Sequence, residues 1–149
     1  MSESFAYHTD LEWFQNILNT GNKNEINFWK TDRPINLIPG ELFFMKNHKK
    51  FIGMGNVNRV ERGVTIKDAW ARYGLRNGAL GLEAMTNLIS EVLDDKSANG
   101  NYKITCIILD NFSSFLPFTF EDVDIPNFQT SKILTDEETQ RVLNHIDHS

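Results

Sequence analysis

The hairpin pattern in the first half of the chain constrains the fold more than any other feature of the sequence. Two apolar runs of strand length flank a short polar turn, which predicts strands over residues 41–47 and 50–61. The tip of this hairpin is His48-Lys49-Lys50. Gly53 and Gly55 in the second strand allow a bulge or a close approach of another backbone. We therefore expect a strand pair that opens into a mouth lined by small residues.

The remaining pattern mixes helices with strands and predicts an α+β fold, with a small mixed β-barrel and peripheral helices. Apolar residues at helical spacing, together with capping residues, predict the helices, and the Ile-rich run predicts the most buried strand. The expected elements are helices over about 10–20, 65–73, 80–94 and 135–146, a short extended piece over 26–29, and a strand over 102–109. Residues 111–127 are expected to be irregular with room for one short strand, and the start of the chain, with His8, is expected to be disordered. We expect a single domain over residues 1–149, whose barrel core covers about 26–128.

The charge distribution is uneven. The chain carries 15 Lys and Arg against 20 Asp and Glu, yet residues 46–76 hold eight basic residues and only two acidic ones. Such a segment can attract phosphates even within an acidic protein; the alternative is a set of solvated loop side chains. The residues predicted to contact phosphates are Lys46, Lys49, Lys50, Arg59, Arg62, Arg72 and Arg76.

The sequence contains no pattern that indicates an enzyme. There is no phosphate-binding loop and no metalloprotease or hydrolase motif. Cys106 lies in an apolar run and is expected to be a packed core thiol. His145 and His148 are expected to be exposed on a terminal helix rather than to bind a metal. We therefore expect a binding domain without a catalytic site, cofactor or metal.

No signal peptide or membrane-spanning run is present in the sequence, and a single cysteine cannot form an internal disulfide. A cytoplasmic protein is expected.

Aromatic and amide side chains gather near the predicted ends of strands. Aromatic rings provide stacking faces for a base, and amides or carboxylates can bind its edge. The candidate base-pocket residues are Asn27, Trp29, Asn56, Asn58, Trp70, Tyr73, Asp110 and Phe112. For Trp70 and Phe112 a place in the core is favoured over stacking, for Trp29 the two are even, and Asp110 is also suited simply to end a strand.

These residues carry a resemblance to PUA-like domains, the group that includes EVE, ASCH, YTH and SRA readers. It rests on Phe28-Trp29, on Pro39-Gly40-Glu41 with Phe43-Phe44, and on the run 51–55. Together with the run 69–78, Leu82-Glu83-Ala84-Met85 and the later Cys106–Leu109 with Phe112 and Phe115, it is most similar to the N-terminal domain of bacterial HNH-type restriction endonucleases.

The resemblance implies a reader that flips a modified base of DNA, such as 5-methylcytosine or 5-hydroxymethylcytosine, into a pocket. In that family the nuclease follows the reader, so this chain is expected to be an excised specificity module or a stand-alone reader in bacterial defence. We expect the partner to be DNA rather than RNA, and we expect no membrane partner. Two alternatives stay open. One is a protein-interaction module that uses the basic segment 46–76, and the other is a small metal-dependent enzyme that uses Glu121, Asp122 and Asp124.

Overall fold

The computed structural model describes residues 4–31, 36–93 and 99–147, which form one six-stranded sheet and four α-helices. The strands are β1 (Ser4–His8), β2 (Ile26–Lys30), β3 (Leu42–Asn47), β4 (Lys50–Thr65), β5 (Lys103–Thr119) and β6 (Ser131–Leu134). The helices are α1 (Leu11–Thr20), α2 (Ile66–Tyr73), α3 (Leu82–Leu93) and α4 (Asp136–Asp147), with short 3-10 turns η1 (Gly74–Asn77) and η2 (Glu121–Val123).

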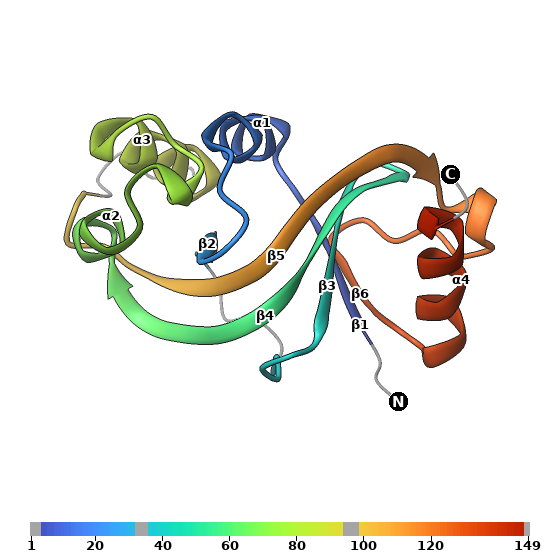
Figure 1. The fold of residues 1–149 in the computed structure, drawn as a ribbon. Coiled ribbons are helices and arrows are strands. Elements are labelled where there is room, and N and C mark those ends of the chain that lie inside the picture. Colours follow the sequence, from blue (N-terminus) through green and yellow to red (C-terminus); the bar gives the residue numbers. More distant parts are fainter. Residues whose placement is uncertain (1–3, 32–35, 94–98, 148–149) are drawn as a thin grey trace.

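The strand order is β2-β5-β4-β3-β1-β6, and every neighbouring pair is antiparallel except β1 with β3. Figure 1 shows that β4 and β5 curve strongly, with α1, α2 and α3 above their concave side and α4 at the other end of the molecule. The predicted α+β class is confirmed. Closure into a barrel is not confirmed, because β2 and β6 stand at the two ends of the strand order.

The predicted hairpin is present as β3 and β4, which pair from Asn47 and Lys50 outward. His48 adopts a left-handed conformation at the tip, with φ of 54°. Gly53 does not line an open mouth, however. A Cβ at this position would lie 2.7 Å from the ring of Phe14, so the glycine accommodates a core phenyl group of α1. The Phe14 ring therefore fills the space where the open mouth was expected.

Two segments are more regular than expected, the irregular segment that begins at Asn111 and the chain start. Residues 111–119 continue β5, because the first half of β4 pairs with them, for example Gly53 with Ser114. The start of the chain forms β1, which lies between β3 and β6 and is buried from Ser4 to Tyr7. Both segments obtain their hydrogen-bond partners from distant parts of the sequence, and β6 is too short to be predicted by itself.

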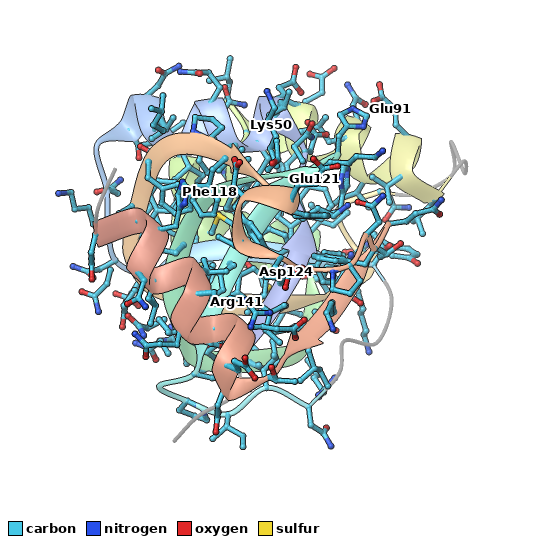
Figure 2. All side chains as sticks on the ribbon, turned by 90° about the vertical axis from the view of Figure 1, so that its right-hand side faces the viewer. Lys50, Glu91, Phe118, Glu121, Asp124 and Arg141 are labelled. Atoms are coloured by element: carbon cyan, nitrogen blue, oxygen red, sulfur yellow. The ribbon has the colours of Figure 1, made fainter. Side chains whose placement is uncertain are left out.

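Capping side chains begin the helices where the sequence predicts. Thr65 accepts a hydrogen bond from the backbone N–H of Asp68 at 3.1 Å. Thr135 and Glu138 cap α4 reciprocally, each side chain accepting from the other's backbone N–H at 3.0–3.1 Å. Figure 2 looks onto α4, where the Arg141 side chain anchors the helix by donating to the carbonyls of Val123 and Asp124 at 2.8 and 2.9 Å.

None of the helices in the described part of the chain has the length and apolar character needed to cross a membrane.

The contact between Gly78 and Trp13 gives a stability prediction. Gly78 has φ of +74°, and a Cβ there would lie 2.0 Å from the indole. We expect Gly78→Ala to lower the free energy of unfolding by about 2–5 kcal/mol, from backbone strain and overpacking together. Urea denaturation measures this. Gly81→Ala is the matched control, since a Cβ there meets nothing within 4 Å, and an equal loss in both variants would contradict the packing assigned to Gly78.

Candidate nucleic-acid interface

Two pockets meet on the side of the sheet where β1, β2 and the β3–β4 hairpin come together. The larger has a volume of about 1070 Å³ and is lined by polar and basic residues. The smaller has a volume of about 310 Å³ and is lined largely by aromatic rings. His8 and Gln129 line both pockets. We call them the basic pocket and the aromatic pocket, and the two neighbouring pockets together are called the two-part cleft.

The aromatic pocket is built from Tyr7 of β1, Trp13 of α1, and Phe28 and Trp29 of β2. The indole N–H of Trp13 donates to the carbonyl of Asn27 at 3.2 Å. That of Trp29 donates to the carbonyl of Asn77 at 3.0 Å. Both indoles are thereby fixed in orientation and have no N–H left for a ligand. Trp13 is 4% exposed and Trp29 is half-buried, so the apolar ring surface available for stacking belongs mainly to Trp29.

A cation sits at the edge of these rings. The Lys30 ammonium lies 3.7 Å from the centroid of the Tyr7 ring, within the range of a cation–π interaction. Both residues line the aromatic pocket, so a planar group bound there would have a positive charge beside it.

The basic pocket contains Lys46, Lys49, Lys50 and two histidines, His8 and His48, and no carboxylate is among its lining residues. Lys49 and Lys50 are exposed at the tip of the hairpin. Positive charges without acidic neighbours produce a local potential that attracts anions, although the whole chain is acidic.

Lys46 occupies a different place from the phosphate contact predicted for it. The residue is 2% exposed. Its ammonium donates to the carbonyls of His48, Phe128 and Gln129 at 3.2, 3.1 and 2.5 Å. These bonds use all three of its N–H groups, so Lys46 holds the 128–129 segment against β3 and acts on a ligand only through its charge. Burial lowers the pKa of this lysine.

The predicted arginines lie at the other end of β4. From Lys50 to Arg59 the strand advances roughly 30 Å, and there Arg59 pairs with Glu61 at 3.0 Å and with Glu25 at 3.2 Å. Arg72 and Arg76 pair with the same two carboxylates, at 3.3 and 3.8 Å. The basic segment is therefore not one continuous face: at its far end three of the four arginines share two carboxylates. Arg62 is exposed on the same half of β4.

Tyr73 belongs to this paired cluster and not to a base pocket. Its hydroxyl donates to Glu61 at 2.6 Å and accepts from Arg59 at 2.9 Å. Burial and the hydrogen bond to Glu61 raise the pKa of Tyr73 to about 12. Burial by itself would raise the pKa of Glu61, but hydrogen bonds from Tyr73 and Arg59 outweigh it and hold that pKa below its ordinary value.

Of the other predicted base-pocket residues, Trp29 alone lines the aromatic pocket. Phe112 is 4% exposed and packs on Phe14 at 5.5 Å, and Trp70 packs against the core beneath α2 and α3. Asn58 donates to Asp110 at 2.7 Å, which ties β4 to β5. Asn56 accepts from Asn111 at 3.2 Å on the same strand pair.

Asn27 is fully buried and supports the site from behind. Its amide donates to Asn77 at 2.8 Å and to the Cys106 sulfur at 3.3 Å. Burial raises the pKa of the Cys106 thiol to about 11, as expected for a packed core residue.

Sequence reasoning missed Tyr7, His8 and Gln129: the first two lie in the chain start that was expected to be disordered, and Gln129 lies between the predicted elements. The one available signal was the apolar run before His8, which is the length of a short strand.

No group of three or more potential metal ligands occurs among the residues that the structure describes. Asp122 accepts from the backbone N–H of Thr119 at 2.9 Å, so it closes the turn after β5, and this bond lowers the pKa of the carboxylate. The His145 ring lies against Phe118 at 4.3 Å between centroids. His148 lies outside the described residues.

The fold is similar to that of solved ASCH proteins. The structure superposes on the ASCH protein of Zymomonas mobilis with a TM-score of 0.68 at 16% identity, covering 95% of this chain and 94% of that chain. A mutant of that protein gives a TM-score of 0.68 at 15% identity, with 96% and 98% covered. No family model matches the sequence, and no curated protein is significantly similar to it. The likeness confirms the PUA-like, ASCH part of the predicted resemblance, at the level of the fold.

The position of His8 gives a titration prediction. Burial lowers the pKa of His8 below 6.5, the charges of Lys46, His48 and Lys30 lower it further, and Asp10 acts in the opposite direction. We expect Lys46→Met to raise the pKa of His8, because one of the facing positive charges is removed. NMR titration of the imidazole protons measures both values. Lys67→Met, an exposed change on α2, is the control, and an unchanged His8 pKa in Lys46→Met would contradict the proximity of the two groups.

Proposed function

We propose that this domain binds nucleic acid without catalysing a reaction, with one base in the aromatic pocket and the adjoining phosphates at the lysine hairpin. The observation that carries the proposal is the junction of the two pockets at His8 and Gln129. A nucleotide has this same division into a flat ring and an anion, a few ångströms apart.

The size of the aromatic pocket supports a single base rather than a stacked pair. A volume of about 310 Å³ is at the lower end for small-molecule sites. Stacking on aromatic side chains contributes about 1–3 kcal/mol per base. A base within a duplex can reach such a pocket only after extrusion from the helix.

Recognition of the base edge is assigned to the polar groups of the pocket wall. Asp10, Thr31, Gln129 and Thr130 line the pocket beside the rings. They offer both donors and acceptors. The finer proposal is that they read a modified cytosine in DNA and that the domain serves as the specificity module of an HNH restriction endonuclease or as a stand-alone reader. It rests on the sequence resemblance, as does the preference for DNA over RNA.

The charge balance favours a short binding site. The net charge of −5 opposes extended contact with a polyanion. The basic pocket is lined by no carboxylate. A cationic patch of this limited size suits a single flipped nucleotide with its neighbours. The same distribution disfavours the alternative in which residues 46–76 dock an acidic protein, because three of the four arginines of that segment already pair with Glu25 and Glu61.

The hairpin lysines provide the direct test of phosphate binding. We expect Lys49→Gln/Lys50→Gln to weaken binding at least tenfold and to reduce its salt dependence, since two phosphate contacts are lost. Fluorescence anisotropy with short single strands, and with duplexes containing cytosine, 5-methylcytosine or 5-hydroxymethylcytosine, at two salt concentrations measures this. The control variant Arg62→Gln/Lys67→Gln removes the same number of positive charges from exposed positions outside the basic pocket. Equal weakening by both pairs would reduce the effect to net charge and contradict the site.

Stacking can be followed through tryptophan fluorescence. Trp13 and Trp29 line the pocket, whereas Trp70 packs against a separate part of the core. We expect nucleic acid to quench the emission of a Trp70→Phe variant, because a stacked base lies on the indole. Adding Trp29→Phe should remove most of that quenching. If quenching survives the Trp29→Phe substitution but is lost when Trp70 is replaced, the base lies elsewhere.

A further inference from the structure

A second depression lies between α1 and α3, outside the cleft described above. It has a volume of about 260 Å³ and is walled by Glu12 and Asn16 of α1 and by Ala84, Leu88 and Glu91 of α3. Figure 1 shows the two helices side by side above the sheet. We call this depression the α1–α3 groove.

One end of this groove is apolar. Ala79, Leu80, Ala84 and Leu88 line it, and Leu80 is 77% exposed. Other exposed hydrophobic residues of the two helices lie outside the groove: Leu18 lines a separate pocket against β5, and Val92 lines the aromatic pocket. The groove therefore offers a short apolar stretch that a partner side chain can cover.

The charge of this surface has one sign. Helix α1 and residues 79–93 contain Glu12, Glu83 and Glu91 and no Lys, Arg or His. Neither Glu12 nor Glu91 forms an ion pair with any described residue. Unpaired carboxylates repel phosphates, so the groove does not extend the nucleic-acid site. They attract a cationic protein surface instead.

The groove has an acidic end and an apolar end. Val92 lines the aromatic pocket together with Asp10 and Trp13, which places the C-terminal end of α3 beside the N-terminal end of α1. Glu91 and Glu12 therefore share one end. The Asn16 amide donates to the carbonyl of Gly78 at 2.9 Å, which places the opposite end near Leu80.

We propose that the α1–α3 groove docks a basic amphipathic helix of a partner protein. Ala84, Leu88 and Glu91 lie on one stripe of α3, and Ala84 and Glu91 are about 10 Å apart at the helical rise of about 1.5 Å per residue. A partner helix that places an apolar side chain near Leu80 and a Lys or Arg near Glu91, about two turns away, matches both ends. This is the helix-in-groove mode of recognition.

The probe for this proposal is a 15-residue helical peptide of Ala, Leu and Lys, with a leucine and a lysine seven positions apart. Its control peptide has every Lys replaced by Glu. Titration into the isotopically labelled full chain, followed by NMR, should give saturable shifts confined to α1 and α3 with the Lys peptide and none with the Glu peptide. Absence of shifts on these helices with the Lys peptide would overturn the proposal.

Substitutions at exposed positions separate this site from general acidity. We expect Glu91→Lys and Leu80→Asp each to weaken peptide binding at least tenfold. Glu121→Lys makes the same charge change on exposed η2, near α4, and should have no effect (Figure 2). Equal binding by Glu91→Lys and the native chain would overturn the proposal.

Two further readouts complete the test. Leu80→Asp should leave binding of single-stranded DNA unchanged, so this proposal and the proposed nucleic-acid function can fail independently. Sedimentation of the native chain should show a monomer. Self-association that Leu80→Asp abolishes would assign the groove to a second copy of the chain and overturn the proposal of a basic helix.

Discussion

The pairing of β4 with β5 is the interaction on which the rest of the structure depends. The two strands are 16 and 17 residues long, and their register shifts at four places. Bulges bend a strand pair and increase its twist, which accounts for the curve in Figure 1. One end of the pair leads into α2 and the arginine–glutamate cluster, and the other carries the lysine hairpin. The length of this pair therefore decides which charges meet and which stay apart.

Pairing of charges, rather than their number, defines the candidate site. Arg59, Arg72 and Arg76 share the two carboxylates of Glu25 and Glu61, which offset most of their charge. Lys49 and Lys50 stand in a pocket lined by no carboxylate. The buried ammonium of Lys46 contributes a fixed positive charge behind them and holds the segment that closes the pocket. An acidic protein thus presents a small cationic cleft on one face and an acidic groove between two helices on another.

Features with local signals were predictable from the sequence, and features that depend on distant partners were not. The hairpin and the caps at Thr65 and Thr135 follow from residues a few positions apart. Strand β1 needs β3, some 40 residues away, and β6, more than 120 residues away, through the pairing of Phe5 with Phe43 and Ile133. Trp29 lines the aromatic pocket, and its contact with a base stays a prediction. Tyr7 and Gln129 reach this pocket only through those long-range pairings. The basic run 46–76 is contiguous in sequence, but the extended strand within it separates its two ends in space.

The central claim is that one nucleotide occupies both pockets at once. The most direct measurement is NMR mapping of a short single-stranded DNA on the labelled full chain. The account predicts saturable shifts at the Trp29 indole N–H, the His8 ring and the amides of Lys49, Lys50 and Gln129. Shifts centred on Arg59 and Arg76, or shifts in the basic pocket without any at Trp29, would contradict it.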